Sequence, residues 1–350
     1  MKKTLVALAV AALAATSANA AVVYNQDGTK LDINGSVRVL LNKSKNTRTN
    51  LGNDGSRINF SAKQDLGNGL SALGYLRLKV NKDNASELSV DKLYAGLGYD
   101  GVGTLTLGKQ YTTANDVELG DYTYKWGGNS TLTTDGEKVA KFRSADFAGF
   151  SFGADYLVGN KEKGGAGLKQ GYGVSAFYTA NFADDVTLNF NAGYTTQKNI
   201  LAKDAETKAK EKFDKRDDIS DVIDAAKIIS SKSKSWLVAT ELTSGPVSVG
   251  VSYGQAKLNI DDKLAKAVDE NGDLKVKAFL VGANYNVTDA AKVYAQYNRT
   301  TGNDGKLNGY ILGTGYKLHK NVETFLEVAR FKASDDKANN LVGVGFRVNF

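Results

Sequence analysis

The sequence predicts an all-β protein, a 16-stranded antiparallel transmembrane β-barrel with long extracellular loops. Three observations point to this fold class. An apolar alternation with a period of two recurs along the chain. Short turns and long charged connections alternate between its segments, and the first 20 residues form an export signal. Together they favour a sheet that closes on itself in a membrane over a sheet covered by a second layer.

The last 11 residues show the alternation most clearly. One face of this segment is apolar throughout and carries Val342, Val344, Phe346, Val348 and Phe350. Successive side chains of a strand point to opposite faces, so Gly343, Gly345 and Arg347 share the other face. We expect the valines and Phe346 to face lipid and Phe350 to lie in the aromatic girdle at the rim.

Segments of this kind occur about 16 times along the chain. They begin near residues 31, 56, 70, 90, 103, 138, 150, 171, 186, 234, 247, 275, 291, 307, 322 and 339. Their polar faces hold Gly, Ser, Asn, Thr and charged residues, which is typical of a wet interior. The segment at 322–331 is harder to interpret, because Phe325 and Phe331 share a face with Glu323 and Glu327.

The connections between segments fall into two alternating classes. The short ones are 66–69, 100–103, 148–149, 183–185, 244–246, 288–290 and 319–321, and most contain Gly, Asn or Asp, as tight hairpins require. The long ones include 42–55, 112–137, 198–233 and 260–274. Short turns at one end and long loops at the other are typical of an outer-membrane barrel. A secreted β-sandwich is the alternative, but its long loops would not alternate so regularly.

The N-terminus indicates export from the cytoplasm. Lys2 and Lys3 form a basic start, residues 5–15 are an apolar run, and residues 18–20 read Ala-Asn-Ala, a small-x-small cleavage pattern. We therefore expect a cleaved signal peptide at 1–20 and a barrel domain at 21–350, in the outer membrane of a Gram-negative bacterium. A buried N-terminal helix is the alternative. No stretch reaches the roughly 20 apolar residues of a transmembrane helix.

Composition argues against several other functions. The net charge of +7, or +5 without Lys2 and Lys3, is too small to favour nucleic acid as a partner. There is no cysteine, and the single histidine, His319, lies in a short turn, so neither a nucleophile–base pair nor a metal or cofactor site is predicted. The chain is thus not expected to be an enzyme. Paired acids at 217–218 and 261–262 could bind divalent cations weakly, or simply be solvated.

The chain resembles the general trimeric porins, and most closely the major porins of Haemophilus and Pasteurella. The resemblance covers the mature chain and rests on residues 23–32 with Gly35, on 56–60 and 65–70, on 105–111, and on the terminal Phe350. It implies a homotrimer that passes small hydrophilic solutes and ions, with a third loop, at about 112–137, folded into the channel. It also implies outer-membrane lipid and lipopolysaccharide as surroundings, and Phe350 as the signal read by the barrel-assembly machinery.

Charged residues predict a constriction inside such a channel. Basic residues of the first six strands are Arg38, Arg57, Lys63, Arg77, Lys79, Lys109, Lys141 and Arg143, and most fall on polar faces. Loop 112–137 carries Asp116, Glu118 and Asp121. If this loop folds inward, acids face bases across water and produce a transverse field. By resemblance, Arg57, Lys109 and Arg143 match the constriction arginines of the family; the alternative for each charge is a solvated residue with no special role.

Two positions depart from the family pattern. Lys125 stands in residues 124–128 where an acid is expected, and Ser36 stands where a basic residue is common. We expect Lys125 to line the pore and the ion selectivity to be weak. An adhesive or solute-specific barrel is the second hypothesis, for which Tyr111, Tyr122, Tyr124 and Trp126 could provide an aromatic site. The long loop at 198–233 contains a helical pattern at 214–229 that could cover the pore mouth or form a mobile surface.

Overall fold

The structure is a computed structural model of the whole chain, and it describes residues 21–45, 47–81, 87–159, 166–201, 207–208, 227, 230–260, 273–303, 305–334 and 337–350. The signal peptide expected at 1–20, the paired acids at 217–218 and 261–262, and most of the helical pattern at 214–229 lie outside these residues. Within them, no helix has the length and apolar character needed to cross a membrane.

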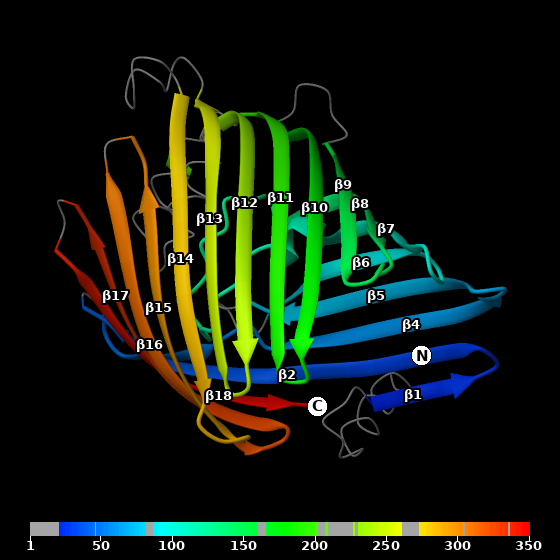
Figure 1. Cartoon of the computed structure of the whole chain (residues 1–350), viewed down its shortest axis with the longest axis horizontal. Coiled ribbons are helices and arrows are strands. Elements are labelled where there is room, and N and C mark those ends of the chain that lie inside the picture. The colour runs from blue at the N-terminus through cyan, green and yellow to red at the C-terminus, as the bar shows by residue number, and fades with distance from the viewer. Residues whose placement is uncertain are drawn as a thin grey trace.

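Sixteen antiparallel strands form a closed ring (Figure 1). They are β2 (Thr29–Ser44), β4 (Arg57–Gly67), β5 (Leu70–Val80), β6 (Leu88–Tyr99), β7 (Gly103–Tyr111), β8 (Asp135–Ser144), β9 (Phe150–Val158), β10 (Gly167–Ala183), β11 (Val186–Ile200), β12 (Ser230–Ser244), β13 (Val247–Ile260), β14 (Asp273–Asn286), β15 (Ala291–Thr301), β16 (Lys306–His319), β17 (Val322–Ala333) and β18 (Asn339–Asn349). Each pairs with the next, and β18 pairs with β2 to close the barrel. The predicted fold class is confirmed, and each predicted strand lies within a few residues of its observed position.

The largest differences concern strand ends next to long loops. β10 and β12 each begin four residues earlier than expected, at Gly167 and Ser230. Their ladders continue beyond the apolar segment, with Lys198 opposite Lys232 and Ser230 opposite Ile260. Backbone pairing does not depend on apolar side chains, so the strands extend past the part that the alternation marks.

Two short strands were not expected from the sequence, β1 (Ala21–Gln26) and β3 (Asn50–Asn53). β4 pairs with β2 only as far as Ser36, and β3 continues that edge along residues 39–42 of β2. On the opposite edge, β18 ends where Phe350 exchanges hydrogen bonds of 2.8 and 3.0 Å with Gly35, and β1 continues from there. Both strands therefore satisfy backbone groups that the barrel would otherwise leave open.

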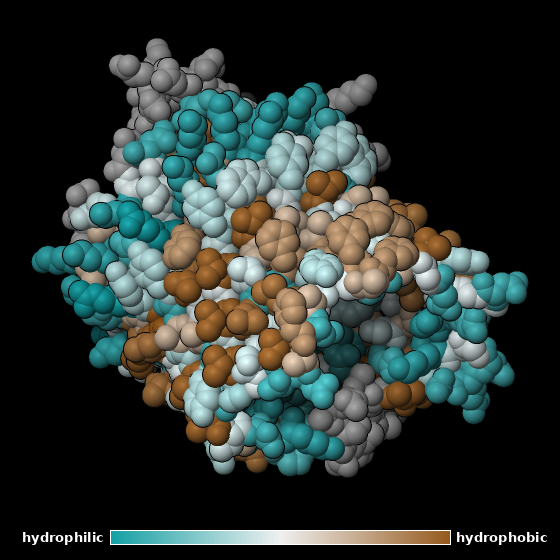
Figure 2. Space-filling model, in the orientation of Figure 1, coloured by the Kyte–Doolittle hydropathy of each residue, from teal (hydrophilic) through white to brown (hydrophobic). Residues whose placement is uncertain are grey.

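The two faces of the sheet differ as the alternation predicts. On β18, Val342, Val344 and Phe346 are 40–46% exposed on the outside, while Leu341 and Arg347 are buried on the inside. The same outward exposure of apolar side chains occurs on strand after strand, and Figure 2 shows it as a brown band between hydrophilic ends. A water-soluble protein does not leave such a continuous apolar surface exposed, so this band marks the lipid-facing zone.

Candidate functional site

Loop three, which we define as residues 112–134 between β7 and β8, enters the lumen. Its two ends meet where Thr112 N–H donates to the carbonyl of Thr134 at 3.0 Å. A short 3₁₀ turn follows at Thr113–Asp116, and the backbone N–H of Thr113 donates to both carboxylate oxygens of Asp155 on β9, at 3.0 and 2.9 Å. This first anchor directs the chain across the barrel.

The middle of loop three lies against β13 and β14 in direct backbone contact. Gly120 has a φ of +85°, and a Cβ atom there would lie 2.6 Å from the carbonyl carbon of Gly250. Glycine is therefore required on both sides of this contact. Next to it, Ser252 Oγ accepts from Leu119 N–H at 3.0 Å and donates to the Leu119 carbonyl at 2.6 Å.

One buried carboxylate binds three consecutive backbone groups at the tip of loop three. Glu327 on β17 accepts hydrogen bonds from the backbone N–H groups of Tyr124, Lys125 and Trp126, at 2.8, 3.2 and 2.9 Å. The Tyr294 hydroxyl donates to it at 2.6 Å. Glu327 is fully buried, and such charge-assisted bonds are about twice as strong as neutral ones.

This arrangement explains the mixed face of 322–331. Glu323, Phe325, Glu327 and Phe331 all point into the lumen beneath the loop tip. The Tyr124 ring stacks on Phe325 with centroids 4.4 Å apart. The strand keeps its ordinary alternation, and its inner face is adapted to a loop rather than to water.

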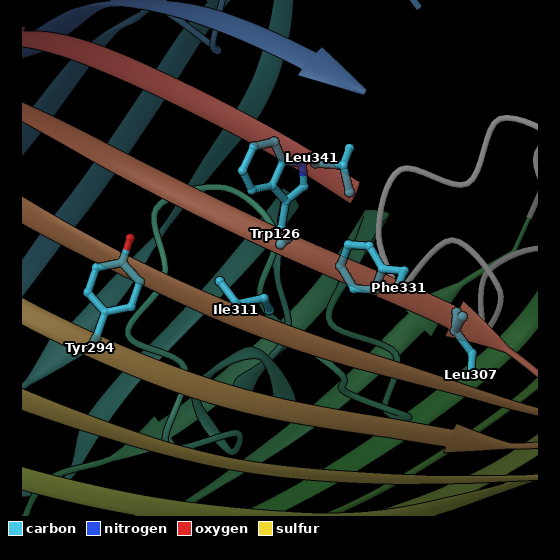
Figure 3. Packing of buried hydrophobic residues seen from close by; sticks show 7 residues of the cluster. Trp126, Tyr294, Leu307, Ile311, Phe331 and Leu341 are labelled. Atoms are coloured by element: carbon cyan, nitrogen blue, oxygen red, sulfur yellow. The ribbon is translucent and has the colours of Figure 1, made fainter. Parts of the chain in front are cut away.

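An apolar cluster forms inside the lumen around the same tip (Figure 3). Trp126 is 1% exposed and packs with Ile311, Phe331 and Leu341, which project from β16, β17 and β18. Burying an aromatic side chain of this size gains roughly 2–3 kcal/mol. The loop tip is therefore docked as firmly as part of a protein core.

The wall formed by β2, β4 and β5 carries arginines. Arg57 lies directly across from Ser36 on one side and from Lys79 on the other, and Arg77 lies across from Asn59. Arg38 Nε donates to Ser36 Oγ at 2.8 Å. Among the described residues, neither Arg38 nor Arg57 has an acidic partner within ion-pair distance.

The remaining predicted cations lie in several places. Lys141 and Arg143 on β8 form a second group near Asp116, and the Arg143 guanidinium lies 3.5 Å from the centre of the Phe177 ring. Lys63 lies near the short-turn end of β4, across from Leu73, and is exposed. Lys109 is not brought to the arginines: it is opposite Leu93, which is 55% exposed on the outer face, and it pairs with Glu137 at 2.9 Å.

The loop acids differ in their surroundings. Asp116 is exposed near Lys141 and Arg143. Glu118 accepts from Asn129 N–H at 2.9 Å, but its removal from water, together with the neighbouring charge of Asp121, raises its pKa to about 8. Burial likewise raises the pKa of Asp121. At neutral pH, Glu118 therefore carries little of the negative charge that the sequence suggests.

Lys125 forms an ion pair at the loop tip. Its Nζ atom lies 3.0 Å from Asp54 Oδ1, and Arg347 contacts the other oxygen of Asp54 at 3.2 Å. Arg347 also donates to the Tyr124 carbonyl at 3.0 Å. The positive charge of Lys125 is thus opposed by an acid from the connection between β3 and β4.

Several residues of the site were missed in the sequence. They are Asp54, Lys92, Lys292, Glu327 and Arg347. Strand parity places Lys92 opposite Arg77 and Arg347 opposite Arg38, so alternation could have placed these two in the lumen. The role of Glu327 and of Asp54 depends on where loop three docks, for which the local sequence has no signal.

Comparisons with known proteins agree on the fold and the family. A family model described as Gram-negative porin matches residues 7–336. The major outer membrane protein of Pasteurella multocida strain Pm70 is 40% identical over 376 residues, covering 100% of both chains. Among solved structures, the trimer form of OmpT from Vibrio cholerae has a TM-score of 0.69 at 21% identity, covering 93% of this chain and 100% of that one. An anion-selective porin from Comamonas acidovorans has a TM-score of 0.69 at 18% identity, covering 92% and 100%.

Proposed function

The chain belongs to the Gram-negative porin family, and on this basis we propose that its narrowest passage lies between loop three and the arginines of β2, β4 and β5. It is an outer-membrane channel rather than an enzyme. Small hydrophilic solutes and ions pass through it by diffusion, and the charges on either side of the passage set its ion preference.

The unpaired arginines carry this proposal. Arg38 and Arg57 face the lumen without an acidic partner among the described residues, while the opposite side of the passage is a loop with carboxylates. Opposed fixed charges across a narrow aqueous gap produce a field that orients dipolar solutes and screens ions. Arg77 adds to the basic side, although Asp91 pairs with it at 3.5 Å.

We propose that the resulting selectivity is weak and leans toward anions at neutral pH. The raised pKa of Glu118 removes one negative charge from the loop, and Asp54 opposes the positive charge of Lys125. Asp116 and Asp121 still oppose the arginines, so the preference stays small. A strong cation preference of the unmodified channel would contradict the placement of Lys125 at the pore.

The test is the reversal potential of planar bilayers in a salt gradient. Replacing Arg38 and Arg57 by Gln removes two uncompensated charges, and we expect a shift toward cations with little change in stability. Lys109→Gln is the matched control, because it removes one charge from the outer face near the same end of the barrel. An unchanged reversal potential in the double variant, or an equal shift in the control, would place the selectivity elsewhere.

The docking of the loop aromatics argues against a solute-specific aromatic site. The Tyr122 hydroxyl donates to Glu241 at 2.8 Å, Tyr124 stacks on Phe325, and Trp126 is buried. The Tyr111 ring lies 4.1 Å from the ammonium of Lys92. Three of these rings are thus held by the barrel wall, and Tyr111, which is 37% exposed, faces a lysine. A conductance that changes linearly with solute concentration supports general diffusion. A conductance that saturates with one solute would contradict it.

We further propose that the signal peptide is removed after Ala20. Ala21 begins β1 and lies opposite Ile33, two residues from the position where Phe350 bonds to Gly35. Cleavage there would place the new ammonium group near the terminal carboxylate. The mass of the protein purified from outer membranes tests this, since retention of residues 1–20 would be evident.

Assembly is the last part of the proposal. The Phe350 ring lies over Gly35, where a Cβ atom would be 2.6 Å from its Cζ, and this half-buried terminal aromatic suits a signal for the barrel-assembly machinery. A homotrimer is proposed from the family and from the apolar outer side of β4–β6. Migration of the unheated protein as a monomer in electrophoresis, or full assembly of a chain lacking Phe350, would contradict these two points.

A further inference from the structure

A cavity of about 350 Å³ lies inside the barrel, between the tip of loop three and the end with the short turns. It is bounded by the neighbouring ends of β14, β15, β16 and β17, which lie side by side in Figure 1, and by Tyr124 of loop three. We call it the turn-side pocket. Ligand pockets measure about 300–1,000 Å³, so its volume suits a small solute.

The docked loop closes one side of the turn-side pocket. The backbone N–H of Tyr124 binds Glu327, and the Tyr124 ring stacks on Phe325. The Tyr124 hydroxyl lies against Gly315 of β16, where a Cβ atom would be only 2.5 Å from the hydroxyl oxygen. Glycine permits this close approach. The pocket is therefore held in shape by the same contacts that hold the loop tip.

The charges of the turn-side pocket are balanced. Among the described residues that line it, Lys292 and Lys317 are the cations, and Asp289 and Glu323 are the acids. Lys317 lies directly opposite Glu323, and Lys292 lies directly opposite Gly315. A simple anion meets two like charges in such a pocket, and so does a simple cation, which disfavours both.

The two ammonium groups are not neutralised by the acids of the pocket. Within the part of the chain that the structure describes, neither lysine forms an ion pair with Asp289 or Glu323. Lys292 Nζ donates to the Tyr122 carbonyl at 3.3 Å and lies 4.4 Å from the centre of the Tyr124 ring. Lys317 Nζ donates to the Asp289 carbonyl at 3.4 Å. These bonds are long, and an ammonium group has three donors, so both lysines keep donors for a solute.

The acids of the pocket keep acceptors in the same way. One oxygen of Glu323 lies 3.8 Å from Arg347, and the other accepts from the Tyr124 hydroxyl at 3.3 Å. Asp289 lies in the short turn between β14 and β15 and is exposed. A carboxylate has about four acceptor positions, so both acids have capacity for further donors. Charged donors and charged acceptors thus line one small cavity.

We propose that the turn-side pocket binds a zwitterionic α-amino acid. Lys292 and Lys317 donate charge-assisted hydrogen bonds to its carboxylate, and Glu323 and Asp289 accept such bonds from its ammonium group. The methyl groups of the neighbouring residues 290 and 291, both alanine, give its side chain a small apolar surface.

This site goes beyond the proposed passage and its ion preference. The turn-side pocket belongs to the wall that binds loop three, whereas the passage is bounded by arginines of β2, β4 and β5. An occupied pocket therefore leaves the ion current unsaturated. Either proposal can fail while the other holds, because one is measured by solute binding and the other by the reversal potential.

The experiment uses the mature protein in micelles of a neutral detergent and L-valine as the probe. Its apparent Kd is measured by ligand-observed NMR at neutral pH, with empty micelles as the blank. Two analogues of the same carbon skeleton each lack one charge: valinamide has no carboxylate, and 3-methylbutanoate has no ammonium group. Single-channel conductance checks that each barrel is intact.

We expect the unmodified protein to bind L-valine about fivefold more tightly than either analogue, because each analogue loses one set of charged contacts. Lys292→Gln and Glu323→Gln should each weaken L-valine binding by a similar factor. The analogues should respond in opposite directions. Lys292→Gln removes a repulsion and should bind valinamide at least as tightly as before, and Glu323→Gln should do the same for 3-methylbutanoate.

Lys320→Gln and Asp184→Asn are the matched controls, because each removes one exposed charge from a short turn outside the pocket. Both should bind L-valine within about twofold of the unmodified protein. Equal binding of L-valine by the unmodified protein and the two pocket variants would overturn the proposal. Equal binding of all three probes, or a parallel loss of all three in the pocket variants, would also overturn it, since a site for a zwitterion must distinguish them.

Discussion

The two walls of the lumen hold their charges in opposite ways. On the wall from β9 to β17, Asp155, Glu241 and Glu327 each accept hydrogen bonds from loop three. On the wall of β2 and β4, Arg38 and Arg57 have no acidic partner among the described residues. The carboxylates of the first wall hold loop three in place, whereas the arginines of the second wall face the solution.

The physical reason is the different cost of burial on the two walls. A carboxylate covered by a loop loses water, so it must receive hydrogen bonds from that loop to be tolerated. A guanidinium that faces an aqueous lumen keeps part of its hydration and remains available to ions. In the proposed channel, bound charges therefore determine the shape of the passage, and unpaired charges determine its ion preference.

The largest expected effect is at Glu327, on the wall that binds loop three. In Glu327→Gln the side chain keeps its shape, but one acceptor oxygen becomes a donor that faces backbone N–H groups. Unpaired buried groups of this kind cost about 2–5 kcal/mol, so we expect a lower free energy of unfolding and larger current fluctuations as the loop tip detaches. Denaturant titration and single-channel recording measure the two effects. Glu241→Gln, which affects only the hydrogen bond from Tyr122, is the control, and equal effects of both variants would contradict the central role of Glu327.

A smaller effect is expected between the walls, from the ionisation of Glu118. Its pKa is raised to about 8, so the stability gained from the neutral form is complete below its ordinary pKa and is lost as the pH rises through about 8. The new negative charge should reduce the anion preference as the pH rises through about 8. Reversal potentials measured from pH 6 to 9.5 test this, with Glu118→Gln as a variant that should not respond. An identical pH response in both proteins would show that another group titrates.

The smallest effect is expected at the junction of the two walls, in Lys125→Gln. Asp54 loses one partner at 3.0 Å but keeps Arg347 at 3.2 Å, so we expect a loss of less than about 1 kcal/mol and a slight shift toward cations. Thermal unfolding and the reversal potential are the measurements. A shift as large as that of the Arg38 and Arg57 double variant would mean that Lys125 is not compensated.

The comparison of the two walls also explains which residues of the site could be predicted from the sequence. Arg38, Arg57 and Arg77 fall on the polar parity of regular strands, so alternation alone places them in the lumen. Lys109 shares the parity of Leu105 and Leu107, which are 48% and 58% exposed, so alternation places it on the outer side, although the resemblance groups it with the constriction arginines.

The roles of Glu327 and Asp54 could not be predicted from the sequence. Glu327 shares a face with Phe325 and Phe331, a mixture that has no meaning until the loop tip is placed above it. Asp54 lies 71 positions from Lys125, and the two meet only because loop three crosses the lumen. No local pattern contains a contact of this range.

By itself, the sequence determined the closed barrel, its 16 strands and the direction in which most side chains point, because strand alternation and turn chemistry are local properties that repeat along the chain. Only the tertiary structure decided where loop three docks, which charges are compensated and which stay free. Those outcomes depend on contacts between segments far apart in the chain, such as Glu327 with the loop tip, and on the loss of water that such contacts cause.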